Sequence, residues 1–391
     1  MISLSHIARS ISSSATLALN AKAQELRLLG HDVINLSVGE PNFPSSEAVK
    51  RAGIEAIKAN FTKYTPESGI AELREAVASF YANEYGISSA RKEHVVISNG
   101  GKQILAMLFA VRLNHNDEVL VPSPYWTSYP EQIKIASGSP IFVETDKNFI
   151  IRASALAKKI TRKTKLILVN SPSNPTGAII PETELRKILA LAKKHTIMII
   201  SDEVYSELYF TNKKPRSIAS FAKNPFEHVI IASSVSKSAA MTGWRIGYAI
   251  AHETIIKQMG AYQSHFSSAP CGVAQKAALQ ALNSEAHAYT EQMRQAFKKR
   301  RDTLVRKLTR IEGITLVPPR GAFYAFCKIS TDIMKKTHNR FTESLLEKEY
   351  VAVVPGTAFG STFKNAFRLS LAVDESVLEE GMRRIKRFVE G

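Results

Sequence analysis

Short apolar segments alternate with helical segments between residues 94 and 250, and this alternation constrains the fold more than any other feature. Six runs dominated by Val, Ile and Leu lie at 95–97, 118–121, 140–143, 166–169, 197–200 and 229–231. A further strand is expected at 244–250. Runs of this length without polar alternation are typical of strands buried on both faces. The pattern therefore predicts an α/β fold with a mainly parallel sheet covered by helices.

The two ends of the chain predict a second, smaller α+β unit. A long helical stretch runs from about 271 to 310. The strands expected beyond it lie near 315–317, 322–326, 351–354 and 367–371, with helices near 341–349 and 375–389. A helical pattern at about 14–29 and an apolar stretch at 33–36 would complete this unit. We expect residues 1–44 to form an N-terminal arm and part of the small domain, 45–290 the large domain, and 291–391 the small C-terminal domain.

Composition bounds the class of protein. The chain has 391 residues, and its 45% hydrophobic and 22% charged content is ordinary for a globular protein. The formal net charge of +17 fits a nucleic-acid binder, but equally an enzyme that attracts anionic substrates. The densest basic run, 298–301, lies in a helical pattern without interleaved aromatic residues. It predicts a solvated helix face rather than a nucleic-acid contact.

Three sequence features bear on the cellular location of the protein: apolar runs, cysteines and the N-terminal segment. No apolar run approaches the roughly 18 residues that a membrane span needs. Cys271 and Cys327 lie far apart and outside any metal-binding pattern, so we expect free thiols in a reducing compartment. The first 24 residues lack acidic side chains, as transit peptides do, but an ordinary N-terminal arm is preferred. These features predict a cytoplasmic protein that binds neither membrane nor nucleic acid.

A lysine follows the last of the six strands in a segment rich in small hydroxylated residues. The run 234–248 contains Lys237 and, eight positions later, Arg245. A buried ammonium is costly, so such a lysine is usually paired or chemically used. Desolvation exposes an amine that can form a Schiff base, while Ser234, Ser236 and Arg245 can hold a phosphate. Pyridoxal 5'-phosphate (PLP) requires both features. A loop lysine near a surface arginine is the alternative.

Polar residues follow other strands as well. Ligands gather at the carboxyl ends of parallel strands, so these residues are candidates for one site. Gly100 and Gly101 open a helix and let backbone N–H groups approach a phosphate, although Gly-Gly is also a common turn. Trp126 follows the next strand and either stacks on a ring or belongs to the core. The glycine patterns of dinucleotide-binding and nucleotide-hydrolysing loops are absent from the sequence.

Three further candidates carry acid, amide and guanidinium groups. Asn174, in a turn after the fourth strand, can donate to an anionic ring oxygen. Asp202 and Tyr205 follow the fifth strand. A carboxylate there can pair with a pyridinium N–H, a bond worth about 1.5–3 kcal/mol that keeps the ring electron-withdrawing. Helix capping is the alternative for Asp202. Arg368, near the C-terminus, suits bidentate binding of a carboxylate, or an ordinary ion pair.

Together these segments resemble the class I (fold type I) aminotransferases along essentially the whole chain. The Lys237 run and the Asn-Ser-Pro-Ser-Asn-Pro-Thr-Gly run at 170–177 match two motifs of that family. The closest resemblance is to bacterial aspartate aminotransferases of subgroup Ib, through short runs at 39–41, 63–64, 100–103, 123–126 and 353–356. It implies a PLP-dependent transaminase that moves an amino group from L-aspartate to 2-oxoglutarate by a ping-pong mechanism, and a homodimer with shared active sites.

The resemblance implies a role for each matching residue. Lys237 would carry PLP and later move a proton. Asp202 would pair with the ring nitrogen, and Asn174 and Tyr205 with the phenolic oxygen. Trp126 would stack on the ring. The phosphate would be bound by Gly101, Lys102, Ser234 and Arg245, and by Tyr64 of the neighbouring subunit. The substrate-binding residues would be Gly39, Lys102, Trp126, Asn174 and Arg368, with Gly39 and Arg368 at the α-carboxylate and Lys102 at the distal one.

One departure from the family pattern concerns prephenate. Members that also use prephenate carry a lysine in a Met-Lys-Pro-Ser-Ala-Thr-like run, whereas residues 11–16 here read Ile-Ser-Ser-Ser-Ala-Thr. The serine argues against prephenate and weakens the dicarboxylate assignment. Aromatic, alanine or prephenate transamination and PLP-dependent lyase chemistry remain alternatives. A regulator that binds PLP without turnover usually adds a helix-turn-helix domain, for which the chain has no spare length.

Overall fold

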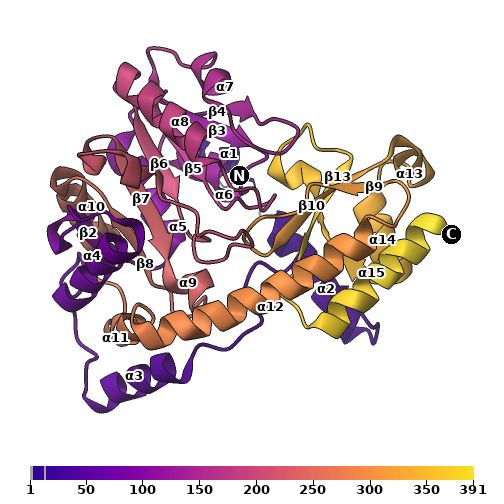
Figure 1. Ribbon diagram of the computed structural model, residues 1–391, viewed down its shortest axis with the longest axis horizontal. Helices are drawn as coiled ribbons and strands as arrows, with labels where there is room; N and C mark the ends of the chain where they lie inside the picture. Colours follow the sequence, from indigo (N-terminus) through magenta and orange to yellow (C-terminus); the bar gives the residue numbers. More distant parts are fainter. Residues whose placement is uncertain (1–2, 13–14) are drawn as a thin grey trace.

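A seven-stranded sheet forms the centre of the computed structural model, which describes residues 3–12 and 15–391 (Figure 1). Its strand order is β2-β8-β7-β6-β5-β3-β4. The strands are β2 (Val95–Ser98), β3 (Glu118–Ser123), β4 (Ser139–Glu144), β5 (Thr164–Asn170), β6 (Met198–Asp202), β7 (Val229–Ser234) and β8 (Gly247–Ile250). Neighbouring strands from β7 to β4 pair in parallel, whereas β8 is antiparallel to both β2 and β7. The predicted mainly parallel sheet is confirmed.

Helices bury both faces of this sheet. Successive residues of a strand point to opposite faces, so Ile199 and Ile200 of β6 enter two different hydrophobic clusters. One face packs against α4 (Ala71–Tyr85), α8 (Glu182–His195) and α11 (Gly272–Gln280). The other packs against α5 (Gly101–Arg112), α6 (Ser128–Ile135) and α10 (Glu253–Phe266). Further helices of this part are α3 (Glu47–Lys58), α7 (Ala153–Ala157) and the one-turn α9 (Val235–Ser238). The continuous apolar runs of the strands follow from this two-sided burial.

Both ends of the chain meet in a smaller α+β unit. Its antiparallel sheet has the order β12-β13-β10-β9, formed by β9 (Ile314–Leu316), β10 (Tyr324–Ile329), β12 (Val354–Pro355) and β13 (Ala366–Ser370). The N-terminal β1 (Ile34–Asn35) pairs in parallel with β11 (Val351–Ala352). Its helices are α2 (Ala15–Leu28), α12 (Ser284–Leu308), α13 (Thr331–Lys336), α14 (Phe341–Glu349) and α15 (Glu375–Glu390), whereas α1 (His6–Ser10) contacts α6 beside the large sheet. The long α12 runs from beside the large sheet to this unit (Figure 1).

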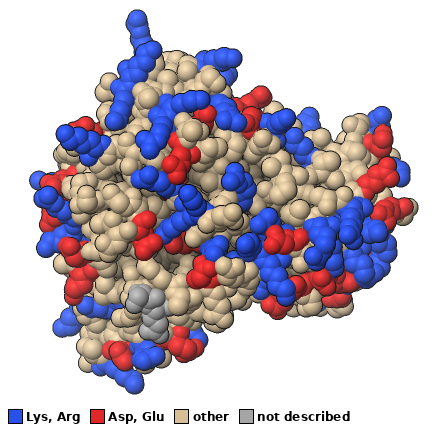
Figure 2. All heavy atoms as spheres, viewed as in Figure 1, with Lys and Arg blue, Asp and Glu red and all other residues tan. Residues whose placement is uncertain are grey.

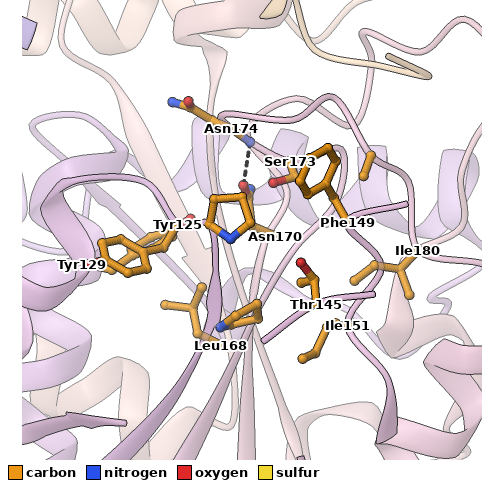
Figure 3. A pocket seen from close by; sticks show the side chains of 13 residues that line it. Tyr125, Tyr129, Thr145, Phe149, Ile151, Leu168, Asn170, Ser173, Asn174 and Ile180 are labelled. Carbon is orange, nitrogen blue, oxygen red and sulfur yellow. Dashed lines mark hydrogen bonds between the residues drawn. The ribbon is translucent and has the colours of Figure 1, made fainter. Parts of the chain in front are cut away.

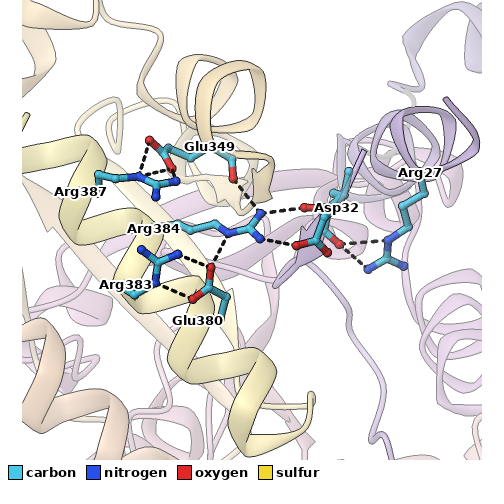
Figure 4. A network of polar contacts seen from close by, with 8 residues as sticks. Arg27, Asp32, Glu349, Glu380, Arg383, Arg384 and Arg387 are labelled. Atoms are coloured by element: carbon cyan, nitrogen blue, oxygen red, sulfur yellow. Dashed lines mark hydrogen bonds and ion pairs between the residues drawn. The ribbon is translucent and has the colours of Figure 1, made fainter. Parts of the chain in front are cut away.

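Arginines of α15 fasten the two chain ends to each other (Figure 4). Arg384 donates to the Asp32 carbonyl (2.7 Å), to the Glu349 carbonyl (3.2 Å) and to Glu380 (2.8 Å), and it also pairs with the Asp32 carboxylate. Arg387 pairs with Glu349 on α14 (2.9 Å). Hydrogen bonds from Arg383 and Arg384 hold the pKa of Glu380 at about 2. The β1–β11 pairing is therefore reinforced by charged contacts around it.

Three details differ from the sequence-based expectations. The helix α10 was not predicted, and the expected helix over 271–310 is interrupted between α11 and α12. The basic run at 298–301 is not wholly solvated. Arg300 is buried, and its guanidinium is satisfied there because it donates to the Asn42 side chain (2.7 Å) and to the Leu371 carbonyl (3.2 Å). Only part of the run, including Lys299, faces solvent.

Lysine and arginine side chains gather over α12 and α15 on the face shown in Figure 2, but acidic side chains are interspersed among them. Lys299 pairs with Glu375 (2.8 Å) and Lys307 with Glu379 (3.0 Å) across the two helices.

No helix within residues 3–12 and 15–391 combines the length and apolar character that crossing a membrane requires. Both cysteines are free thiols, as predicted, with Cys327 buried and Cys271 exposed.

Candidate active site

A cavity of about 500 Å³ opens at the carboxyl ends of the central strands. Its walls come from the β2–α5 turn, the ends of β5, β6 and β7, the segment 37–40 and strand β13. Eleven of the twelve predicted site residues line it: Gly39, Gly101, Lys102, Trp126, Asn174, Asp202, Tyr205, Ser234, Lys237, Arg245 and Arg368. Tyr64 does not, and its side chain is 93% exposed. Residues from both chain ends thus share one cavity with the large sheet.

Lys237 projects into this cavity from the short helix that follows β7. Ser234 ends the strand and caps the helix, because its hydroxyl accepts a hydrogen bond from the Ser236 N–H (3.3 Å). The Lys237 ammonium donates to the Gly39 carbonyl (2.7 Å). Desolvation lowers the pKa of Lys237 to about 8, Glu40 opposes this, and the nearby cations Arg245, Arg368 and Lys102 add to it. A lysine with such a pKa is a usable base and nucleophile near neutral pH.

Asp202 lies at the end of β6 and is buried. Its Oδ2 accepts a hydrogen bond from the Tyr129 hydroxyl (2.6 Å) and its Oδ1 accepts one from the Val204 N–H (3.2 Å). Burial raises the pKa of Asp202 to about 6, and these two hydrogen bonds limit the rise. Residues 203–217, which come directly after β6, contain no helix, so the alternative of a helix cap at Asp202 is wrong.

The turn between β2 and α5 forms an anion-binding corner. Gly100 has φ +88°, and a Cβ on it would overlap the Arg245 guanidinium. A Cβ on Gly247 would overlap the backbone of Gly100, so both glycines are needed for this close approach. Arg245 donates to the Thr242 carbonyl (2.9 Å). The Lys102 ammonium lies 5.3 Å above the Trp126 ring, and desolvation, with Arg245, lowers its pKa. A helix N-terminus with two cations suits a phosphate.

Arg368 is a buried cation that pairs with no carboxylate of the described chain. It donates to the Asn174 side-chain oxygen (2.9 Å) and to the Ser37 carbonyl (3.0 Å), while its Nε has no partner among the described residues. Its guanidinium lies 4.2 Å from the Tyr324 ring centroid. The alternative of an ordinary ion pair is therefore wrong, and the residual hydrogen-bonding capacity fits an anionic ligand.

The loop that carries Asn174 is tied to the acid. The Asn170 side chain accepts from the Asn174 N–H (2.9 Å) and donates to the Asp202 carbonyl (3.1 Å).

A separate cavity of about 20 Å³ lies beside Asn170, Ser173 and Tyr125 (Figure 3). It has room for about one water molecule, so it is not a substrate site.

Sequence reasoning missed several residues of the large cavity, above all Tyr129, Asn170, Tyr324 and Ser37. Tyr129 carried no usable signal, because Trp126 lies outside α6 and an aromatic residue in the first turn of a helix is equally typical of the core. The Tyr205 hydroxyl already has a hydrogen-bond partner in the cavity, since it lies 3.1 Å from the Tyr324 hydroxyl. Trp126 is half-buried, and it both lines the cavity and packs against the hydrophobic cluster on this face of the sheet.

These groups fit PLP. The cavity offers an amine of lowered pKa, a buried acid, and a glycine turn flanked by cations. They meet the needs of an aldehyde, a pyridine nitrogen and a phosphate respectively. Fold and cavity together therefore suit an enzyme whose carbonyl cofactor would be bound by a lysine.

Comparison with known proteins identifies the family. The model of the family "Aminotransferase class I and II" matches residues 31–385. Aspartate aminotransferase of Bacillus subtilis is 43% identical over 96% of each chain, and a protein of Aquifex aeolicus named "Probable aspartate/prephenate aminotransferase" is 42% identical over 96% of each. The structure of Thermus thermophilus aspartate aminotransferase with maleate superposes with a TM-score of 0.93 at 40% identity, covering 99% of this chain and all of that one.

This chain therefore belongs to the class I and II aminotransferases, a family that uses PLP, and it is an aminotransferase of the aspartate aminotransferase type.

Proposed function

We propose that this aminotransferase moves the amino group of L-aspartate to 2-oxoglutarate with PLP as its cofactor. The observation that carries the proposal is one cavity in which Lys237 and Asp202 meet Arg368, a cation that pairs with no carboxylate among the described residues. In a ping-pong sequence, oxaloacetate leaves before 2-oxoglutarate enters, so one site serves both substrates.

Three groups of residues would hold the cofactor. Lys237 would bind its aldehyde carbon, Asp202 its ring nitrogen, and the corner formed by Gly101, Lys102, Ser234 and Arg245 its phosphate. Trp126 would stack on the ring, and Asn174 and Tyr205 would contact its phenolic oxygen. When bound, PLP supplies a carbonyl carbon that accepts the amino group and a ring that takes up negative charge.

The chain's own residues orient the substrate and move its proton. Arg368, Gly39 and Asn174 bind the α-carboxylate, which orients the Cα–H bond of the donor toward the Lys237 amine. Lys237 Nζ then takes the Cα proton as general base. Because desolvation lowers the pKa of Lys237 to about 8, a useful fraction of this amine is neutral near pH 7.5. Asp202 stays ionised by virtue of the Tyr129 hydrogen bond.

Lys102 is the candidate for the distal carboxylate of aspartate and 2-oxoglutarate. It lies at the cavity rim beside Trp126, and its ammonium has no ion-pair partner among the described residues. The maleate in the Thermus thermophilus structure is a dicarboxylate, which supports this substrate class. Prephenate is disfavoured by Ser12, whose N–H donates to Glu131 (3.1 Å); its neighbours Ser13 and Ser14 lie outside the described residues.

A homodimer with shared active sites is part of the proposal. Tyr64 is a large aromatic side chain that is 93% exposed, which leaves it free to contact a second copy of the chain. Each copy would then place Tyr64 against the cofactor phosphate of the other. The domain division at residues 45 and 290 and the cytoplasmic location also remain predictions. The free thiols support the latter.

The test is a panel of amino donors assayed with 2-oxoglutarate while the visible absorbance of the cofactor is followed. We expect aspartate to have the highest kcat/KM and oxaloacetate to be its product. A higher kcat/KM for alanine, an aromatic amino acid or prephenate-derived donors would reassign the specificity. Release of ammonia from aspartate in a single turnover without 2-oxoglutarate would instead indicate lyase chemistry.

A further inference from the structure

The loop between α3 and α4 carries Tyr64 and is held by two buried glutamines that contribute nothing to the cavity itself. Residues 59–70 contain neither helix nor strand. Gln263 of α10 and Gln275 of α11 are both fully buried beneath this loop. A buried amide is costly unless its hydrogen bonds are made, so the partners of these two side chains show what they stabilise.

Gln275 bonds to both sides of the loop. Its Oε1 accepts from the Ile70 N–H (2.8 Å), and its Nε2 donates to the Thr65 hydroxyl (3.0 Å) and to the Pro270 carbonyl (2.9 Å). Thr65 is the residue directly after Tyr64. Gln275 therefore fixes the loop at the position next to the exposed aromatic ring.

Gln263 links the same loop to the strand that leads into the anion-binding corner. Its Nε2 donates to the Ile97 carbonyl (2.8 Å) and to the Glu67 carbonyl, while its Oε1 has no partner among the described residues. The Ile97 N–H donates in turn to the Ser68 carbonyl (3.0 Å). Gly69 completes the contact, because its φ is +96° and a Cβ there would overlap the Ile97 side chain. Residues 65–70 are thus fastened to β2 and to two helices.

The outer part of the loop has no comparable support. Thr62, Lys63 and Tyr64 are exposed. The helix that buries Gln263 also presents Tyr262 and Phe266 outward, stacked on each other with centroids 5.5 Å apart and exposed by 38% and 64%. Tyr64 therefore projects from a fixed base, and two aromatic side chains of α10 are exposed as well.

We propose that Gln275 and Gln263 are positioning residues, which hold residues 65–70 so that Tyr64 of one copy reaches the cofactor phosphate of a second copy of this chain. The inference rests on the shared active sites of the proposed function. It predicts that loss of the glutamine contacts weakens the neighbouring copy's site and leaves the site of the same chain unchanged.

Hybrid dimers test this directly. Two differently tagged chains are co-expressed and dimers that carry both tags are isolated. One chain carries Lys237→Ala and so has no lysine to bind the cofactor covalently, and the other provides the only functional site. Thr65→Val, which removes one hydrogen bond of Gln275, is placed on either chain. Gln275→Glu, which keeps the acceptor for Ile70, is the second variant. The readouts are the PLP dissociation constant of the functional site, from its visible absorbance, and its kcat.

With the substitution on the Lys237→Ala chain, the functional site should bind PLP about fivefold more weakly, as expected for one lost hydrogen bond. With the substitution on the functional chain, the affinity should match that of the unsubstituted hybrid. An equal effect in both arrangements, or an effect only in the second, would overturn the positioning role.

Tyr64→Phe in the same two arrangements separates this inference from the proposed function. If Tyr64→Phe weakens the neighbouring site and the Thr65 and Gln275 variants do not, the glutamine role is wrong and the shared site stands. If Tyr64→Phe has no effect in either arrangement, or the chain forms no dimers, shared sites are refuted and the inference with them.

Discussion

The Tyr129 hydroxyl donates a 2.6 Å hydrogen bond to the Asp202 carboxylate, and both side chains are buried at the floor of the cavity. Burial alone raises the pKa of Asp202, whereas this bond favours the ionised form. An ionised Asp202 is what a protonated ring nitrogen needs as its partner. Tyr129 therefore controls whether the acid at position 202 is available in the required state.

Tyr129→Phe should lower both the PLP affinity and kcat by about tenfold, because a hydrogen bond to a charged group is worth about 1.5–3 kcal/mol. The pKa of Asp202 should rise above 6, so the loss should grow as the pH falls from 8 to 6. Steady-state kinetics and cofactor titration across this range provide the measurement. Tyr125→Phe is the matched control, since the Tyr125 ring stacks on Phe142 instead. Equal behaviour of the two variants would refute the role of Tyr129.

Arg368→Lys should raise KM for both aspartate and 2-oxoglutarate by about 10–100-fold. A lysine cannot reproduce the planar two-pronged contact, and it is costly in a site that is almost completely buried. The affinity for PLP should change little, because the proposal assigns Arg368 to the substrate and not to the cofactor. Initial-rate kinetics with both substrates would detect the effect. An unaltered KM accompanied by weaker PLP binding would mean that Arg368 serves the cofactor.

Lys102→Ala should lower kcat/KM for aspartate by about tenfold or more relative to alanine, which has no distal carboxylate. A partly exposed ion pair contributes only modestly to the binding of the substrate. The ratio of kcat/KM for aspartate to kcat/KM for alanine separates this contribution from any general loss of activity in the variant. Lys102→Arg is the control that keeps the positive charge. If both substrates lose rate equally, Lys102 acts on the phosphate and another group binds the distal carboxylate.

Glu203 should make stability depend on pH. It is buried beside Asp202 and accepts hydrogen bonds from the hydroxyls of Ser201 (2.7 Å) and Ser217 (2.6 Å). Burial raises its pKa to about 7 from an ordinary 4.5. The folded state therefore holds a proton that the unfolded state releases, and this contribution is present below pH 4.5 and lost as the pH rises to 7.

Glu203→Gln removes this titration. Between pH 5 and pH 8 the wild type should lose about 2–3 kcal/mol of unfolding free energy relative to the variant. Urea unfolding of both proteins without cofactor, at the two pH values, gives the comparison. Parallel changes in the two proteins would show that Glu203 is already ionised in the fold.

Sequence reasoning reached the central sheet because most of its strands are continuous apolar runs buried on both faces; in the edge strand β4 only Val143 is buried. The antiparallel direction of β8 could not be predicted, because strand direction depends on the path of the connection from Lys237 to Gly247. The helix α10 was overlooked in the same way, although it covers one face of the sheet. Arg300 was expected in solvent because its partners, Asn42 and the Leu371 carbonyl, come from distant segments of the chain.

The residues of the site also fall into those that local sequence patterns predict and those that only the fold brings together. Residues at strand ends were predictable, because parallel strands bring their carboxyl ends to one edge. The bond between Arg368 and Asn174 joins residues 194 positions apart, so no local pattern contains it. Tyr129 reads as an ordinary core aromatic until the fold places it against Asp202.

Borohydride reduction of the PLP-loaded protein followed by peptide mapping tests the central claim most directly. Reduction should fix one cofactor per chain on Lys237, and Lys237→Ala should keep its fold, bind PLP without this covalent link and lose turnover. A modification on another lysine, or a colourless protein that takes up no PLP and leaves Lys237 unmodified, would contradict the account.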